Sequence, residues 1–451
     1  MNIQLSDHFT YKKLFRFVLP SVLMMLFISI YGVVDGLFVS RFVGKNAFAA
    51  INLIMPFPMI LGGMGFMIGA GGTALVAKTL GEGDIPRARK IFTMMLWFTL
   101  ILGATLTAIG VIFIRPIAYA LGATDAMIEY CVSYGRIVII FTASFMVQNL
   151  FQNFLVTAER PNIGLISTVA AGLTNMALDA LFIVGFNMGV SGAAFATGTS
   201  QCVGAIIPLI YFLKDNDSPL RLVRTRLELR PILKACANGS SELMSNISSS
   251  VVSIVYNLVL MHYIGEDGVS AYGVLMYVQF IFISMFIGYV IGSAPIVGYN
   301  YGANNIGELR NIFKKSVMVM LISGAVMMAA SILLAPLLSS IFVGYDETLY
   351  TLTLKALRLF SFSFLLAGLN IFASSLFTAL NNGLISAIIS FLRTLVFQLA
   401  SVILLPLVFE SDGIWYSITA AELFAFVISL VFVIANAKKY KYFSLERKND
   451  K

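Results

Sequence analysis

The sequence contains little charge. Only 12% of its 451 residues are Asp, Glu, Lys or Arg, whereas a soluble domain carries about 25%. Since 59% of the residues are hydrophobic, the chain could not cover a water-exposed surface with polar groups. This composition excludes a soluble globular protein and indicates that lipid surrounds the chain. The net charge of +8 comes from short basic runs between apolar stretches, so it predicts cytoplasmic loops rather than a nucleic-acid partner.

The residues on which many enzymes and metal sites depend are also scarce. The two histidines are His8 and His262, and the three cysteines are Cys131, Cys202 and Cys236, with no metal or redox spacing among them. The sequence has no G-x-x-x-x-G-K-[ST] loop for ATP phosphates and no HExxH, GxSxG or CxxC motif. We therefore predict neither an enzyme nor a cofactor, and we expect an ion gradient to supply the energy for any transport.

Long apolar runs dominate the sequence. A membrane-spanning helix needs about 20 apolar residues, whereas a β-barrel strand needs about 10 with strict alternation. The candidate spans are 14–40, 47–80, 91–114, 131–157, 163–184, 190–213, 232–263, 269–301, 312–334, 349–380, 384–408 and 414–435. The pattern predicts an all-α integral membrane protein of about twelve transmembrane helices.

The basic residues fall on one side of this topology. Lys and Arg gather before the first span, in every second loop and after the last span, whereas the intervening loops carry mostly Asp and Glu. Because cytoplasmic loops are enriched in Lys and Arg, both termini are predicted to be cytoplasmic, in a multi-pass protein of the plasma or inner membrane.

The two halves of the chain resemble each other. GEGDIPRARKIF begins at Gly81 and GANNIGELRNIF at Gly302, while GLIS occurs at Gly164 and again at Gly383. An ordered series of matches at one nearly constant offset predicts two pseudo-symmetric six-helix bundles related by an axis along the membrane normal. The predicted units are an N-terminal bundle over 1–213, a cytoplasmic linker over 214–231, a C-terminal bundle over 232–437 and a basic cytoplasmic tail over 438–451. Alternating access by rocking one bundle against the other follows from this arrangement.

A few ionisable residues lie inside the predicted spans, where charge is costly and usually functional. The clearest are Asp35, Asp179 and Glu242. Asn175 precedes Asp179 by four residues and shares its helix face, and Thr197 adds a hydroxyl one span later. Oxygen atoms of this kind can bind Na⁺ through Asp35 and Asp179, or the two carboxylates can share a proton. The sequence leaves these two alternatives open.

The chain is rich in methionine and phenylalanine, with 21 and 37 residues respectively. Flexible Met and flat aromatic side chains suit a cavity that accepts varied apolar ligands. The predicted substrate-binding residues are Glu242, Tyr31, Phe57, Met64, Phe151, Met276, Tyr277, Gln279 and Phe280. Arg393 and Glu422 could also pair between the last two spans.

Several motifs resemble the multidrug and toxic compound extrusion (MATE) family, most closely its MepA branch. They are VDGLFVSRFVG from Val34, TAERPN from Thr157 and LTNMALDALFIVGFNMGVSGAAFAT from Leu173. The resemblance implies a V-shaped cavity between two six-helix bundles and export of lipophilic, often cationic, drugs against H⁺ or Na⁺. It also implies that Asp35, Asn175, Asp179 and Thr197 match the family's N-lobe cation site, and that Glu242 loosely matches an acidic C-lobe position.

Other functions remain as alternatives. A flippase for a lipid-linked oligosaccharide or another amphiphile would suit the wider superfamily, but such a cavity tends to be cationic, whereas the candidate charges here are mainly acidic. A transporter of the major facilitator type would carry a G-x-x-x-D-R-x-G-R-[KR] loop, which the sequence lacks. An intramembrane enzyme would need a catalytic constellation that we do not find. The expected partners are small lipophilic cations and the bilayer, and we expect a monomer.

Overall fold

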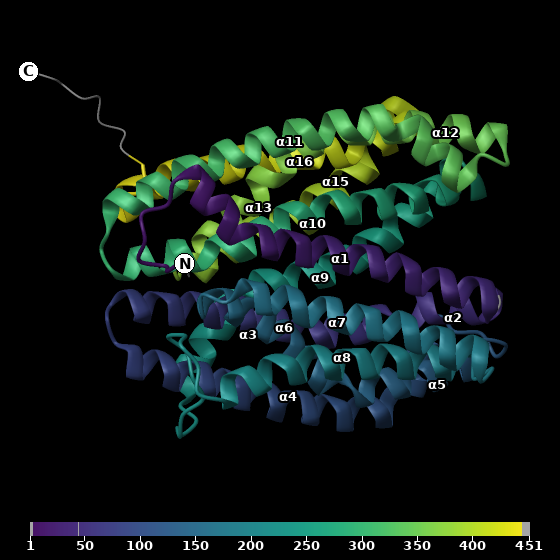
Figure 1. The fold of residues 1–451 in the computed structure, drawn as a ribbon. Helices are drawn as coiled ribbons and strands as arrows, with labels where there is room; N and C mark the ends of the chain where they lie inside the picture. Colours follow the sequence, from purple (N-terminus) through teal and green to yellow (C-terminus); the bar gives the residue numbers. More distant parts are fainter. Residues whose placement is uncertain (1–2, 44, 444–451) are drawn as a thin grey trace, which may run out of the picture.

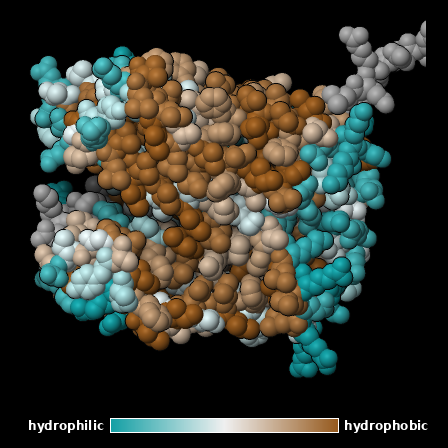
Figure 2. Space-filling model, turned by 180° about the vertical axis from the view of Figure 1, so that it is seen from behind, coloured by the Kyte–Doolittle hydropathy of each residue, from teal (hydrophilic) through white to brown (hydrophobic). Residues whose placement is uncertain are grey.

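The chain forms a bundle of long helices with an apolar waist. The computed structural model describes residues 3–43 and 45–443, and within these ranges all regular structure is helical. Ten of the described helices are long and apolar enough to cross a bilayer, and twelve spans result if each of two bent helix pairs counts as one. Figure 2 shows a broad hydrophobic band between two polar ends. The chain is therefore a multi-pass helical membrane protein, which confirms the predicted fold class.

The helices follow one another in two sets. The N-terminal half contains α1 (Tyr11–Phe42), α2 (Lys45–Ile54), α3 (Pro56–Gly81), α4 (Ile85–Ala120), α5 (Ile128–Ile140), α6 (Thr142–Thr157), α7 (Pro161–Asp179), the π-helical turn η1 (Ala180–Gly185) and α8 (Gly189–Leu213). The C-terminal half contains α9 (Leu229–Tyr263), α10 (Glu266–Gly302), α11 (Ile306–Val343), α12 (Glu347–Ser361), α13 (Phe364–Ala379), α14 (Gly383–Phe391), the π-helical turn η2 (Leu392–Val396), α15 (Phe397–Leu404) and α16 (Pro406–Tyr440).

Local signals set the ends of several helices and repeat between the halves. The Asp84 carboxylate accepts a hydrogen bond from the backbone N–H of Arg87, and the Asn305 side chain accepts one from Glu308 at the corresponding place in the second half. The predicted fourth and tenth spans are both broken, by bends of 53° and 48°. These matching caps and bends belong to a structural repeat.

Two boundaries of the predicted units differ from the observed helices. The helix α9 begins at Leu229, inside the predicted linker, because Pro231 is tolerated in the first turn of a helix. The helix α16 runs through Lys438 and Lys439 to Tyr440, so the predicted tail begins as helix. Residues 444–451 of that tail lie outside the described residues.

The two halves lie side by side (Figure 1). From the N-terminal half α1 and α3 pack against α9 and α10 of the C-terminal half. Glycines allow backbones to touch here: a Cβ at Gly71 would collide with the Ala235 carbonyl, and one at Gly302 with the Lys78 carbonyl. We call the end where α1 begins and α16 ends the terminal end. These contacts hold the halves together toward that end, whereas Figure 2 shows a notch between them at the opposite end.

Residues 3–10, here called the N-terminal segment, lie across the terminal end and contact both halves. The Leu5 N–H donates to Glu159 Oε1 at 2.7 Å in the N-terminal half. The Phe9 N–H donates to Glu308 Oε1 at 2.9 Å in the C-terminal half, and His8 Nδ1 lies 2.7 Å from Glu308 Oε2. Leu5 and Phe9 are 1% and 0% exposed, so the segment is packed into the protein rather than lying on its surface.

Candidate functional site

Two acids from different helices, the half-buried Asp35 and the fully buried Asp179, meet in the N-terminal half. Asp35 lies in α1, and Asp179 is the last residue of α7. Asn175 precedes Asp179 by one helical turn on the same face. The Asp35 carboxyl lies beside the Asp179 carboxyl and the Asn175 amide. The structure thus brings three of the four predicted ion-coupling residues together.

The oxygen atoms at this site have little to bond to. Asp179 and Asn175 are 0% and 2% exposed. Among the described residues, no hydrogen-bond donor serves Asp35 Oδ1, either carboxylate oxygen of Asp179, Asn175 Oδ1 or the hydroxyl of Thr197. Buried polar atoms are nearly always satisfied in native proteins, and each unsatisfied one costs about 1–3 kcal/mol. A small cation or a shared proton would stabilise this arrangement.

Tyr134 belongs to the same cluster, although the sequence patterns do not point to it. It lies in α5, is 1% exposed, and places its hydroxyl beside the Thr197 hydroxyl and within electrostatic range of Asp35 and Asp179. The same hydroxyl lies 3.7 Å from Met55 Sδ. Tyr134 therefore connects Thr197 to the acid pair, and nothing in its local sequence distinguishes it from the other tyrosines of the chain.

The backbone is irregular beside the acid pair. Directly after Asp179 the helix widens into η1, which covers Ala180–Gly185. Single π-helical turns inside α-helices occur frequently at functional sites. The acid therefore lies where regular helical hydrogen bonding changes register, a feature that apolar periodicity alone does not predict.

Glu242 lies in a different place, at the boundary between the halves. It is in α9, between Gly239, which packs against the Met67 carbonyl, and Asn246, whose side chain faces Gly63. Both neighbours contact α3, and Glu242 is three and four residues from them, so it shares the face of α9 that meets the N-terminal half. Among the described residues, none donates a hydrogen bond to its carboxyl. Glu242 is therefore separate from the acid pair, and its predicted role in substrate binding stays a prediction.

The other predicted lining residues divide between the halves. Tyr31 lies one turn before Asp35 and touches Gly172 of α7, while Phe57 and Met64 are half-buried in α3. The four positions from α10 are half-buried or exposed: Met276, Tyr277, Gln279 and Phe280. Their role as a shared lining stays a prediction.

Phe151 does not fit the predicted lining. It is 0% exposed and packs in an aromatic cluster in which its ring centroid lies 6.5 Å from that of Phe92 and 5.5 Å from that of Phe212. In this structure Phe151 belongs to the core of the N-terminal half, because α4 and α8 cover the face of α6 that carries it.

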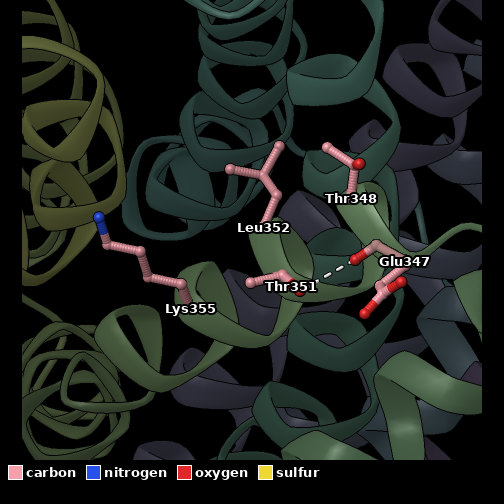
Figure 3. A pocket seen from close by; sticks show the side chains of 5 residues that line it. All are labelled: Glu347, Thr348, Thr351, Leu352 and Lys355. Atoms are coloured by element: carbon pink, nitrogen blue, oxygen red, sulfur yellow. Dashed lines mark hydrogen bonds between the residues drawn. The ribbon is translucent and has the colours of Figure 1, made fainter.

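An open hollow of about 490 Å³ lies elsewhere, on α12 of the C-terminal half. Figure 3 shows its lining residues, Glu347, Thr348, Thr351, Leu352 and Lys355. The Thr351 hydroxyl donates to the Glu347 carbonyl at 2.9 Å, and Lys355 points away toward Asp412, 2.6 Å from its Oδ1. None of the predicted site residues lines this hollow.

Comparison with known proteins places the chain in a family. The family model described as MatE matches residues 20–181 and 243–404, once in each half. The multidrug export protein MepA of Staphylococcus saprophyticus is 25% identical over 409 residues, which cover 90% of this chain and 88% of that protein.

Two solved structures have the same fold. One is described as the outward-facing conformation of a multidrug resistance MATE family transporter of the MOP superfamily, with a TM-score of 0.92 at 22% identity over 98% of this chain and 99% of that one. The other is a MOP superfamily transporter from Pyrococcus furiosus, described as having a binding pocket of reverse polarity that suggests a different function, with a TM-score of 0.89 at 23% identity over 96% and 97% of the two chains. The matches in both halves, together with full-length agreement in fold, show that the chain is a transporter of the MatE family.

Proposed function

We propose that the chain exports lipophilic, cationic drugs from the cytoplasm by antiport against H⁺ or Na⁺. The observation that carries this proposal is the acid pair, Asp35 and Asp179, in which Asp35 Oδ1 and both carboxylate oxygens of Asp179 have no donor among the described residues. Multidrug export is the named activity of the MepA relative. The proposed site lies inside the N-terminal half of a cell-membrane protein, with both termini cytoplasmic.

Coupling requires that drug and ion influence each other's binding. Negative charge attracts a cationic drug as well as a small cation, so occupancy of the acid pair by one disfavours the other, and by linkage the effect is reciprocal. Ion binding from outside then favours drug release, and drug binding from inside favours ion release.

The conformation fits one stage of such a cycle. The halves are in contact at the terminal end, where Gly71 and Gly302 pack against backbone, and Figure 2 shows the notch at the opposite end. With the termini in the cytoplasm, this is an outward-facing state. Rocking the halves about the contact between them would close the notch and open the terminal end.

The decisive experiment neutralises the acids one at a time. Asp35→Asn and Asp179→Asn should each abolish drug resistance in cells while the protein accumulates in the membrane at its usual level. Asp125→Asn, at an exposed acid outside the acid pair, is the matched control and should retain resistance. Normal drug efflux by both site variants would refute the assignment.

The coupling ion is identified separately. Purified protein in proteoliposomes is given a Na⁺ gradient or a pH gradient of equal size, and drug movement is followed by fluorescence. Antiport predicts that one gradient drives uptake and that collapsing it stops uptake. Movement of a lipid-linked sugar without either gradient would instead favour the flippase alternative.

A further inference from the structure

The C-terminal half contains counterparts of the acid-pair positions, and they are neutral. The offset that separates Gly81 of GEGD from Gly302 of GANN leads from Asp35 to Tyr256. The offset that separates the two GLIS motifs leads from Asp179 to Gln398. The structure brings these two residues together, because Tyr256 Oη donates to Gln398 Oε1 at 3.2 Å. Where one half has two acids, the other has a neutral hydrogen bond.

The C-terminal half also contains a buried acid, at a position that corresponds to neither Asp35 nor Asp179. Glu422 in α16 is 3% exposed. Arg393 in η2 donates to it from Nε, 3.0 Å from each carboxylate oxygen, and from Nη2 at 2.8 Å. Asn370 of α13 donates a further bond to Glu422 Oε2 at 2.7 Å. This acid is fully engaged by the protein itself.

The two buried acid centres therefore differ in how their charge is balanced. The oxygens of Asp179 have no donor among the described residues, whereas both oxygens of Glu422 are bonded to a guanidinium. A buried carboxylate is very costly unless a cation or hydrogen-bond donors compensate it. Arg393 is also the more exposed partner, with a side chain 15% exposed against 4% for Glu422. Removing its guanidinium would thus uncover the carboxylate.

We propose that Arg393 is a tethered cation that occupies the acid centre of the C-terminal half, so that this centre takes no mobile ion and the transported ion binds in the N-terminal half. The inference rests on the proposed cation coupling and specifies how many centres take part. Glu242 lies at the boundary between the halves, outside both centres, and is the same in every variant below.

The proposal predicts what happens when the tethered charge is removed. In Arg393→Gln the Glu422 carboxylate loses its cation and must take up a proton or Na⁺ to remain buried. In the double variant Arg393→Gln/Glu422→Gln both charges are gone, so neutrality is restored without an ion. A purely structural ion pair would predict instability in the single variant but no new cation binding.

The first test measures thermal stability of purified protein against cation concentration. A ligand that binds the folded state raises the melting temperature with its concentration. Melting of Arg393→Gln should shift upward with NaCl, against choline chloride at equal ionic strength, or with acidification, by more than that of the wild type. The double variant should follow the wild type. The proposal would be overturned if the melting temperatures of all three proteins depended equally on cation concentration. It would also be overturned if the double variant folded but Arg393→Gln folded under none of these conditions.

The background variant Asp35→Asn/Asp179→Asn separates this idea from the proposed function. Adding Arg393→Gln to it should still confer cation-dependent stability, because that dependence comes from Glu422. If the background variant loses no cation dependence relative to the wild type, the acid-pair assignment fails while the test of Arg393 remains valid.

The second test measures the ion-to-drug ratio in proteoliposomes from the drug gradient reached at a set ion gradient, with the membrane potential clamped. Arg393→Gln should raise the ratio by one ion, or lose drug transport while still binding 22Na⁺ or taking up a proton in excess of the wild type. The double variant should keep the wild-type ratio. An unchanged ratio and unchanged ion binding in Arg393→Gln would show that the guanidinium does not stand in for a mobile ion.

Discussion

The contact between the N-terminal segment and Glu159 gives a prediction about the closed terminal end. The Leu5 N–H donates to Glu159 Oε1 at 2.7 Å, and Leu5 itself is 1% exposed. Glu159 lies between α6 and α7 of the N-terminal half, whereas the Phe9 end of the segment is bound by Glu308 of the C-terminal half. Separation of the halves at this end must break one of these attachments.

The variant Glu159→Ala removes the acceptor and leaves the Leu5 N–H buried without a partner. An unsatisfied buried donor costs about 1–3 kcal/mol, and part of this is offset because the variant no longer buries a carboxylate. A net loss of about 1–2 kcal/mol would shift the closed-to-open equilibrium by roughly 5- to 30-fold. Glu159→Gln keeps an oxygen that accepts the same bond, so it should close at least as firmly as the wild type.

The assay is a distance distribution across the terminal end. Spin labels at Lys90→Cys in α4 and Lys314→Cys in α11, both exposed positions in different halves, are introduced after replacing the three native cysteines. Pulsed electron resonance should show a longer-distance population that grows in Glu159→Ala and not in Glu159→Gln. If the two variants gave the same distribution as the wild type, the segment would not contribute to closure and the reasoning would be wrong.

Three further predictions concern the protonation of Glu159, a close glycine contact and an exposed ion pair. Burial raises the pKa of the Glu159 carboxyl above its ordinary value of 4.5, although the Leu5 N–H opposes this. The closed state therefore binds the proton at Glu159 more tightly than the open state, so acidification should increase the closed population of the wild type and a rise in pH above this pKa should decrease it. The same distance measurement should show neither change in Glu159→Gln. A Cβ at Gly239 would collide with the α3 backbone, whereas one at Gly273 would meet nothing within 4 Å. Gly239→Ala should therefore reduce drug efflux several-fold, and Gly273→Ala should not. Equal efflux by the two variants would show that transport does not need this close approach of α3 and α9. The Lys355–Asp412 pair, with side chains 53% and 40% exposed, should contribute about 0–1 kcal/mol to the free energy of unfolding. Lys355→Met should therefore leave the melting temperature nearly unchanged. A large fall in melting temperature would mean that the packing of α12 against α16 depends on this pair.

The apolar runs predicted the number of spans but not the lengths of the helices. The run from Ile91 predicts the third span, whereas α4 begins at Ile85, because Asp84 caps it there. Hydropathy reports which residues can face lipid, and a helix continues into water as long as its backbone bonds are made. No proline predicts the bend at Phe141, between α5 and α6, because this bend depends on tertiary packing.

The site was predictable where its residues share a helix and less so where they do not. Asn175 and Asp179 are four residues apart, so their common face follows from helical geometry. That Asp35 lies beside them depends on how α1 packs against α7, and the family resemblance rather than spacing indicated it. Tyr134 belongs to another helix, α5, and its hydroxyl comes to lie beside Thr197 only when the helices pack together.

The position of the acid pair has a consequence for how ion binding could move the halves. The site lies inside one half, so an ion there does not bridge the two bundles directly. The helix α1, however, carries Asp35 at the site and also contacts the other half, where Gly288 and Gly292 of α10 approach the backbone of Val22 and Val18. Because these contacts involve backbone atoms, a small displacement of α1 cannot be absorbed by side-chain rotation alone. Neutralising Asp35 should therefore change the distance between α1 and α10 as well as the affinity for the ion. A variant that lost ion binding but kept this packing unchanged in both the outward-open and the inward-open state would show that coupling takes another route.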